Sequence, residues 1–573
     1  MKTRGIKTKE HVIDLTSMTR EEPEQYAAAL ETEKSELTAK LSWYEEQFRL
    51  SRQKRFGASS EKSDSQQLSF FNEAESEQDE SRPEPEMTDL QPRRKQTGKK
   101  QKGQKEKITK KLPKQVIEYR LSAEEQICPK CGNRLHEMKK EVRKELTVLP
   151  ARVTVTEHVT YSYACRNCEN TGIEVTIRKA PSPVPMFRNS LASPSLIADL
   201  LVKKYDLALP LYRQEQDWNR NGVQLNRKTL ANWVIAASER YLQPLYQQMK
   251  EDLLRRQILH ADETEVEVLR EPGRKAEQKS WMWLYRTSGC DSDQPIVLFD
   301  YRDSRSGDCA AEFLRGFCGY LQTDGYAGYH AVTAKPEIGP PQVLAVGCLA
   351  HARRKYEEAR KAMPRDADPK TALSVQGLEY CNRLFAIEWQ ADEKGLSFEE
   401  RKPFREEQAR PVWEAVLAWA QNAVKQALTK SSLANALNYT LNQAEALQRY
   451  LKDSRLEISN NRAERTIKPF VIGRKNWLFS NTPKGAHASA VVYSVIQTAK
   501  ECRLNLFRYL QYLLETMPSI NRNRTEELRK LLPYSPDLPE FCRQSGQEKS
   551  GRDEADSEIL SKAEKASGSF PKQ

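Results

Sequence analysis

Two Cys-x-x-Cys pairs constrain this chain more than any other feature of its sequence. The pairs are Cys128/Cys131 and Cys165/Cys168, and 33 residues separate them. Each pair can turn two thiolates toward one ion, and two pairs complete a closed tetrahedral site, so the segment predicts one structural Zn²⁺. The alternatives are a thioredoxin-like redox pair, which two pairs without a βαβ context disfavour, and unrelated buried thiols.

The spacer between the pairs supports this interpretation. From Val153 to Tyr163 the odd positions are mostly Val and Tyr, whereas the even positions are Thr, His and Ser. This alternation predicts a strand that leads into the second cysteine pair. We assign residues 113–180 to a four-cysteine zinc-binding domain.

Charge sets the broad class of the protein. The chain has 573 residues, 30% of them charged, and a net charge of +12, which indicates a polyanionic partner without identifying it. No apolar run approaches the ~18 residues that a membrane span needs. The N-terminal sequence MKTRGIKTKE lacks the apolar core of a secretory signal, so we expect a cytoplasmic protein without a membrane partner.

The distribution of charge locates a linker. Residues 61–89 carry ten acids and two bases, and residues 93–114 carry eleven bases and one acid. Neither block has enough apolar residues to offset the entropy of ordering, so we predict a disordered linker at 58–112. The polar stretch 544–573 is predicted to be a disordered tail.

Upstream of the linker, residues 1–57 are assigned to a leucine-zipper-like helix. Leu30, Leu37 and Tyr44 are spaced by seven, and Leu41 and Phe48 follow the latter two after four residues. Such a heptad pattern favours a coiled coil and therefore self-association. A helix packed on its own chain is the alternative.

Residues 190–252 are predicted to form successive helices. Asn226 can cap the helix that follows the turn around Gly222, in the manner of a helix-turn-helix. That second helix would present Arg227, Lys228 and Asn232 to a DNA groove. An ordinary helical hairpin with a solvated basic face is the alternative.

Beyond residue 255 the pattern becomes mixed α/β, with three successive strands predicted at 258–269, 280–287 and 295–301. Asp262 and Asp324 fall at strand ends that could lie side by side. Glu464 is a third candidate, in the first turn of a helix that an Asn opens and Pro469 ends. Three carboxylates can bind two Mg²⁺ ions for phosphodiester chemistry. The bases that could take the phosphates are Arg465, Lys468, Arg474 and Lys475. With 80 acids in the chain, spacing alone does not select this triple.

Four long motifs carry a family resemblance. HADETEVEVL, TDGYAGY, GCLAHARRKY and NNRAERTIKPFVIGRKNWLFSNTPKGAHASAVVYSVIQTA resemble those of insertion-sequence-66 family transposases, in the same order along the chain. The resemblance implies an RNase H-like mixed-sheet core whose catalytic Asp-Asp-Glu triad falls on Asp262, Asp324 and Glu464, with two Mg²⁺ or Mn²⁺ ions.

The resemblance also orders the rest of the chain. It implies a core in two parts, 253–351 and 456–520, an all-α insertion at 352–455 and a C-terminal element at 521–543. Independently of the resemblance, His351, Arg353 and Arg354 are candidates for contact with a phosphate or the DNA end, and a basic helix start at the surface is the alternative.

The implied function is a DNA transposase. It would bind terminal inverted repeats as an oligomer, hydrolyse a phosphodiester at each end and use the freed 3′-OH to attack target DNA in a bacterial cytoplasm, on the nucleoid. Small accessory proteins of the same element are implied partners. Two alternatives remain: a non-catalytic, zinc-containing DNA-binding regulator, and an RNase H-like nuclease without strand transfer.

Overall fold

The computed structural model describes residues 184–333, 342–363, 372–521 and 524–544, together with isolated positions and short segments. The short pieces are Asp368, residues 155–159, 161–164 and 177–179, and positions 34, 37, 40, 41, 44 and 45. Contacts divide the chain into two compact units, Ser59–Ser182 and the remainder. The four cysteines, the whole of the predicted linker and the predicted tail from residue 545 onward lie outside the described residues.

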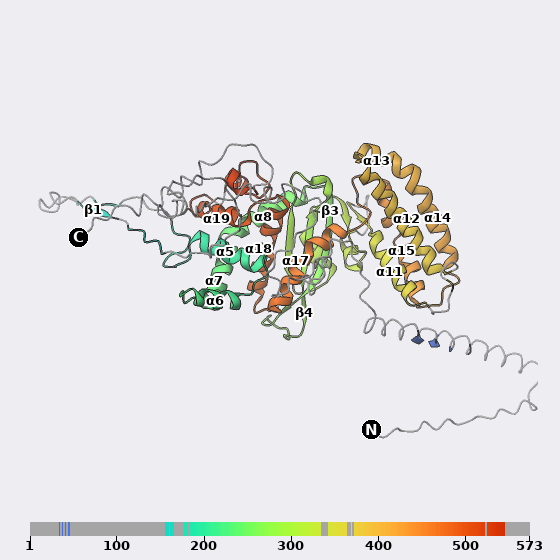
Figure 1. Cartoon of the computed structure of the whole chain (residues 1–573), viewed down its shortest axis with the longest axis horizontal. Coiled ribbons are helices and arrows are strands. Elements are labelled where there is room, and N and C mark those ends of the chain that lie inside the picture. Colours follow the sequence, from blue (N-terminus) through green and yellow to red (C-terminus); the bar gives the residue numbers. More distant parts are fainter. Residues whose placement is uncertain are drawn as a thin grey trace, which may run out of the picture. The chain divides into compact units, whose positions relative to one another are not determined.

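A mixed sheet forms the centre of the larger unit (Figure 1). Its strand order is β5-β4-β3-β6-β7, and the short β8 pairs with the far end of β3. Strand β4 pairs antiparallel with β3 and with β5. Strands β6 and β8 pair parallel with β3, and β7 pairs parallel with β6. The bounds are β3 Ile258–Val268, β4 Lys279–Thr287, β5 Val297–Arg302, β6 Gly319–Gln322, β7 Val343–Val346 and β8 Phe479–Ser480. The three strands predicted at 258–269, 280–287 and 295–301 are therefore present, and they form an antiparallel meander.

The outer edge of β5 is closed by side chains of neighbouring helices. The hydroxyl groups of Thr498 and Ser494 on α18 (Pro483–Glu501) accept the backbone N–H groups of Val297 and Phe299 at 3.0 and 2.8 Å. Tyr246 of α8 (Gln243–Leu254) donates to the Phe299 carbonyl at 3.0 Å. A strand edge left open would expose unpaired backbone groups to other chains, so these contacts both anchor the helices and protect the sheet.

The helices that precede the sheet in the sequence pack against helices that follow it in the sequence. Asn226 caps the third of them, accepting the Thr229 N–H at 2.8 Å, as predicted. Their apolar side chains join those of the sheet and of α18 in one continuous core. The bounds are α5 Pro194–Tyr205, α6 Leu211–Arg220, α7 Arg227–Ala237, a π-helical turn Ser238–Leu242, and the later α19 Leu506–Thr516 and α20 Thr525–Arg529.

A second core belongs to helices inserted after β7. Trp413, Leu384 and Tyr356 are among its buried residues. The helices are α11 Leu349–Lys361, α12 Leu373–Glu393, α13 Phe398–Phe404, a π-helical turn Arg405–Ala409, α14 Arg410–Ala423, α15 Ser432–Asn442 and α16 Ala444–Gln448. After them α17 (Asn461–Trp477) returns to the sheet and packs on β3. Short helices α9 Gly307–Phe313 and α10 His330–Thr333 connect the strands.

Two predictions about local structure are wrong. Pro469 does not end the glutamate helix, which continues to Trp477, because Ile467, Phe470 and Gly473 are buried against the core and packing offsets the hydrogen bond that proline lacks. Of the strand predicted from Val153 to Tyr163, the described residues show β1, Ser162–Ala164, which pairs with β2, Ile177–Lys179. Residues 155–159 are exposed and have no strand structure, so the predicted strand is wrong there.

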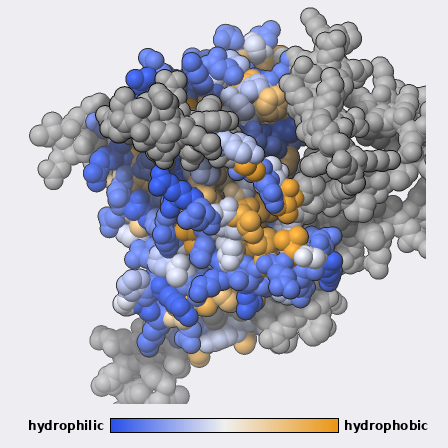
Figure 2. Space-filling model, turned by 90° about the vertical axis from the view of Figure 1, so that its left-hand side faces the viewer, coloured by the Kyte–Doolittle hydropathy of each residue, from blue (hydrophilic) through white to orange (hydrophobic). Residues whose placement is uncertain are grey.

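Figure 2 shows a face that is largely hydrophilic, with apolar residues gathered in a patch near its centre. No helix in the described ranges is long and apolar enough to cross a membrane.

Candidate functional site

The three predicted acids are carried by three elements that meet at the middle of the sheet. Asp324 follows β6 by two residues, at the predicted strand end, whereas Asp262 lies inside β3 and not at its end, because the strand continues to Val268. In the parallel register Gln322 lies opposite His260, which places the two aspartates at the same level of neighbouring strands. Glu464 lies in the first turn of α17, which packs on β3.

Electrostatics around Asp262 reflect this convergence. Burial raises the pKa of the Asp262 carboxyl well above its usual range, and the charges of Glu263, Asp324 and Glu464 raise it further. Its only stabilising contact among the described residues is the Glu263 backbone N–H, which donates to Oδ1 at 2.8 Å. Neither Asp262 nor Asp324 has a cationic partner in the described part of the chain. The arrangement therefore concentrates negative charge that a bound cation would compensate.

Glu263 and Glu265, the acids that follow Asp262 on β3, are bound by other residues. Arg305 donates to the Glu263 carboxylate at 2.6 Å, and the Tyr329 hydroxyl donates to its other oxygen at 2.7 Å. Glu265 forms an ion pair with Lys279 at 2.7 Å on the neighbouring strand. Glu263 and Glu265 are thus paired with other residues, whereas Asp262 has no cationic partner among the described residues.

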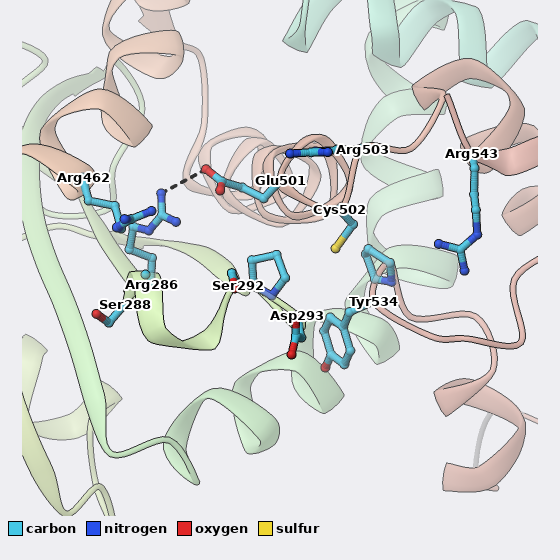
Figure 3. A pocket seen from close by; sticks show the side chains of 13 residues that line it. Arg286, Ser288, Ser292, Asp293, Arg462, Glu501, Cys502, Arg503, Tyr534 and Arg543 are labelled. Atoms are coloured by element: carbon cyan, nitrogen blue, oxygen red, sulfur yellow. Dashed lines mark hydrogen bonds and ion pairs between the residues drawn. The ribbon is translucent and has the colours of Figure 1, made fainter. Parts of the chain in front are cut away.

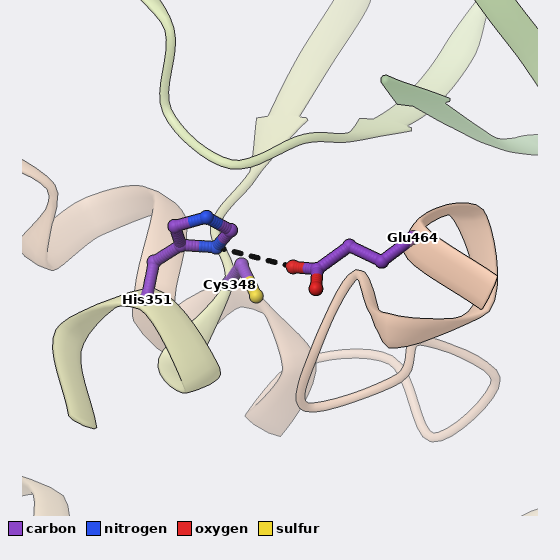
Figure 4. Close-up of side chains that lie close together, drawn as sticks. All are labelled: Cys348, His351 and Glu464. Atoms are coloured by element: carbon purple, nitrogen blue, oxygen red, sulfur yellow. Dashed lines mark ion pairs between the residues drawn. The ribbon is translucent and has the colours of Figure 1, made fainter. Parts of the chain in front are cut away.

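Glu464 faces α11, the helix after β7. Its Oε2 lies 3.4 Å from Arg354, and its Oε1 lies 3.6 Å from His351 Nδ1 (Figure 4). The predicted DNA contacts His351 and Arg354 therefore border the acids. Arg353 instead donates to Asn382 of α12 at 2.7 Å, within the insertion.

Asn460 fixes the start of the glutamate helix. Its side-chain amide donates to the Ala261 carbonyl at 2.9 Å, and its side-chain oxygen accepts from His260 Nδ1 at 2.9 Å. Burial lowers the pKa of His260 to about 4, so the ring is neutral and donates from Nδ1. Asn460 thus binds α17 to the residues beside Asp262 instead of capping the helix with its side chain.

Tyr439 supports Asp324 in a similar way, because its hydroxyl donates to the Asp324 backbone carbonyl at 2.7 Å. Neither Asn460 nor Tyr439 was assigned these roles from the sequence. Their partners are more than 100 residues away, and no local pattern connects them.

The remaining predicted DNA contacts lie on two helices. On α17, Arg465 and Lys475 are exposed and Lys468 is half-buried. The pKa of Arg474 is lowered because the side chain is partly buried, and the negative charges of Glu265 and Glu267 offset only part of this decrease. On α7 the exposed side chains are Arg227, Lys228 and Asn232. The described contacts do not bring this α7 group to the three acids.

Comparison with known families decides the assignment. The family model described as "Transposase IS66 family" matches residues 189–488, which include all three acids. The chain belongs to this transposase family. A model described as the zinc-finger binding domain of transposase IS66 matches residues 125–169, and one described as "Transposase C of IS166 homeodomain" matches 43–117, which includes the whole predicted linker.

Relatives of this IS66-family chain occur in Sinorhizobium fredii (strain NBRC 101917 / NGR234). Uncharacterized protein y4jD is 30% identical over 433 residues, which cover 74% of this chain and 81% of the relative. Uncharacterized protein y4qI is 30% identical over 403 residues, covering 68% and 70%. Uncharacterized protein y4hP is 28% identical over 420 residues, covering 71% and 73%.

A separate cavity of about 480 Å³ lies between the β4–β5 loop, α17 and the end of α18 (Figure 3). Arg286 donates to Glu501 at 3.0 Å in its wall, and Arg462 donates to Glu457 at 2.5 Å. Two of its four arginines are therefore already paired. The cavity contains none of the three converging acids, so it does not form part of the candidate site.

Proposed function

We propose that this chain is a DNA transposase that binds the terminal inverted repeats of its element, hydrolyses a phosphodiester at each end and transfers the strand to target DNA. The observation that carries the proposal is the placement of Asp262 on β3, Asp324 just after the neighbouring β6 and Glu464 on α17, which packs on β3, in a chain of the IS66 family. The triad is proposed as its catalytic group.

The arrangement of the sheet supports an RNase H-like core. Such a core needs two acid-bearing strands side by side and a third acid on a helix packed over them. Here β3 and β6 are parallel neighbours at the centre of the sheet, and α17 lies against β3. The helices from α12 to α16 separate the second and third acids, in keeping with an all-α insertion.

The donor set suits Mg²⁺ or Mn²⁺. Hard cations take carboxylate oxygens, and the unmatched negative charge around Asp262 favours two of them. Bound there, these ions would activate the attacking water or hydroxyl and stabilise the leaving oxygen. A structural Zn²⁺ at Cys128, Cys131, Cys165 and Cys168 is proposed from the four thiolates and the zinc-finger match.

The chain's own residues have distinct tasks in this proposal. Asn460 holds the glutamate helix in place against β3, and Arg354 orients the Glu464 carboxylate. Exposed Arg465 and Lys475 would bind backbone phosphates, whereas Arg227, Lys228 and Asn232 of α7 would read a groove. Self-association through the N-terminal helix and the participation of accessory proteins extend the proposal to the assembled complex.

The test is metal-dependent cleavage of duplex DNA that carries the element's ends, with the full chain. We expect strand cleavage and joined products with Mg²⁺ or Mn²⁺. Asp262→Asn should reduce cleavage by about 10²–10³-fold or more, the usual cost of removing a charge-stabilising group, and alanine at Asp324 or Glu464 should act alike. Glu265→Gln on the same strand is the matched control and should retain activity.

Each other outcome identifies a different protein. Binding of the ends with intact strands would indicate a regulator, and cleavage without joined products would indicate a nuclease. Unchanged cleavage in Asp262→Asn would remove that residue from the site.

A further inference from the structure

Two buried polar atoms next to the acids lack partners. His351 Nδ1 and Glu464 Oε1 are each inaccessible to solvent and make no hydrogen bond within the described structure. They face one another at 3.6 Å. Buried polar atoms without partners are costly, and an atom that both could bind would remove that cost.

A thiol completes this group. The Sγ of Cys348, one Nδ1 or Nε2 atom of His351 and a carboxylate oxygen of Glu464 all lie within 4.8 Å of one another (Figure 4). Cys348 ends the loop after β7 and His351 lies in the first turn of α11, so a Cys-x-x-His spacing presents both. Among the described His, Cys and acidic residues, this is the one group of three whose donor atoms come so close.

We propose that Cys348, His351 and Glu464 form a binding site for a thiophilic divalent ion of the Zn²⁺ class, distinct from the Mg²⁺ site but sharing Glu464 with it.

The donor spacing suits a tetrahedral ion. Zn²⁺ lies ~2.0–2.1 Å from nitrogen and oxygen ligands and ~2.3 Å from sulfur, so its ligand atoms are roughly 3.3–3.6 Å apart. The 3.6 Å between His351 Nδ1 and Glu464 Oε1 is at this limit. Mg²⁺ takes oxygen ligands and keeps much of its water, so a thiolate and an imidazole do not suit it. Glu464 could therefore serve either metal, and the other ligands make the choice. Cys348 and His351 favour Zn²⁺, whereas the two aspartates favour Mg²⁺.

Binding requires two local changes. First, the Cys348 thiol loses its proton to solvent. Its sulfur then binds the ion and no longer accepts the Asn460 backbone N–H, which now donates to it at 3.1 Å. Arg354, which lies 3.3 Å from His351 Nε2 and is half exposed, turns toward solvent so that Nε2 can carry the ring proton. A water molecule can supply the fourth ligand.

The consequence is regulatory, and it rests on the proposed transposase function. An ion held by Cys348 and His351 engages the Glu464 carboxylate, which Mg²⁺ at the two aspartates would also need. Zn²⁺ would therefore inhibit Mg²⁺-dependent cleavage by competing for one carboxylate and not by displacing DNA.

The binding arm of the test does not depend on catalysis. The full chain with its own zinc is titrated with Co²⁺, and the sulfur-to-cobalt charge-transfer absorption is compared between wild type and Cys348→Ser. We expect one equivalent in wild type that Cys348→Ser lacks. Cobalt that enters the four-cysteine segment contributes equally to both, so the difference isolates this site.

Two further variants make the result specific. Cys381→Ser removes an equally buried thiol of α12 and should keep the extra equivalent. Asp262→Asn should also keep it, although it loses Mg²⁺-dependent cleavage. His351→Gln should lose it, and this variant repeats the test if Cys348→Ser does not fold.

The activity arm adds micromolar Zn²⁺ to a cleavage reaction that contains millimolar Mg²⁺. We expect wild-type cleavage to fall, and Cys348→Ser to cleave normally with a Zn²⁺ tolerance about 10–100-fold higher, the usual effect of losing a metal-site group. Equal cobalt binding by wild type and Cys348→Ser overturns the site. Binding without inhibition overturns the regulatory role, whereas cobalt binding by a chain that never cleaves leaves the metal site intact and rejects the transposase function.

Discussion

Glu388 and Asp262 are both shielded from water, but only Glu388 is paired with cations among the described residues. Glu388, in the inserted helix α12, is only 6% exposed and is fully paired. Arg405 donates to its two oxygens at 2.8 and 2.7 Å, and Arg401 donates at 3.2 Å. Asp262, on the central strand, has one backbone N–H and three acidic neighbours.

The contacts of the Glu388 cluster hold the inserted helices together. Arg405 also donates to the backbone carbonyls of Tyr450 and Leu456 at 2.6 and 3.0 Å, so the Glu388 cluster ties three segments of the insertion together. It needs nothing else. The Asp262 cluster has no cationic partner among the described residues, which is what the proposed metal site requires.

The largest effect is expected where the pairing is complete. Glu388→Gln leaves Arg405 as an unpaired buried charge and should destabilise the insertion by about 3–5 kcal/mol. Native-state hydrogen exchange of α12 measures this without assuming that the whole chain unfolds in one step. Glu393→Gln, exposed on the same helix, is the control and should change stability by less than about 0.5 kcal/mol. Equal effects of the two would mean that the cluster does not hold the insertion together.

The reverse sign is expected at the incomplete cluster. In metal-free protein, Asp262→Asn should protect β3 by about 1–2 kcal/mol, the order of the penalty for a buried group without a full set of partners. Mg²⁺ should invert the ranking, because an ion at 100 times its dissociation constant stabilises wild type by about 2.7 kcal/mol and has no full site in the variant. Exchange of β3 amides with and without Mg²⁺ measures both. A variant that is destabilised without metal would show that the Asp262 charge is already satisfied.

The sequence anticipated the elements better than the site. Period-two patterns located β3, β4 and β5 within two residues, and Asn226 was recognised as a cap because capping is a local interaction. Pro469 was misjudged because the burial of Phe470 that sustains the helix is a tertiary fact. The alternation after Val153 did not give a strand at 155–159, because a period-two pattern alone does not supply the hydrogen-bonded neighbour that a strand needs.

The three acids could be proposed from the sequence only through the family motifs, since spacing among 80 acids selects nothing. Their catalytic role stays a prediction, as do the zinc ligands, which lie outside the described residues. The pairing of Asn460 with His260, 200 positions away, could not be anticipated, because hydrogen-bond partners so distant leave no pattern in one sequence.

The pH dependence sharpens the comparison further. Because the pKa of Asp262 is raised in the folded state, the folded chain binds this proton more tightly than the unfolded chain does. Stability from this group is present at low pH and is lost as pH rises through the raised pKa, by at most about 1.4 kcal/mol per pH unit. His260 opposes this below its ordinary pKa of 6.5, since its folded pKa of about 4 makes protonation favour unfolding.

The difference between wild type and Asp262→Asn cancels the His260 contribution. In metal-free protein we expect this difference, measured by exchange of β3 amides, to grow in favour of the variant as pH rises above the ordinary carboxyl range. Saturating Mg²⁺ should flatten it. A difference that does not vary with pH would mean that Asp262 titrates normally.

The smallest effect tests whether pairing matters only where water is excluded. Glu406 and Arg410 form an i,i+4 ion pair whose side chains are 40% and 38% exposed. Glu406→Gln should cost only about 0.3–0.5 kcal/mol, because solvent screens the pair and its side chains lose entropy on pairing. The same exchange measurement on α14, at low and at high salt, should show that this small cost disappears with salt, whereas the cost of Glu388→Gln persists. A salt-resistant loss of several kcal/mol at Glu406 would break the comparison, because burial would then not be what distinguishes the two pairs.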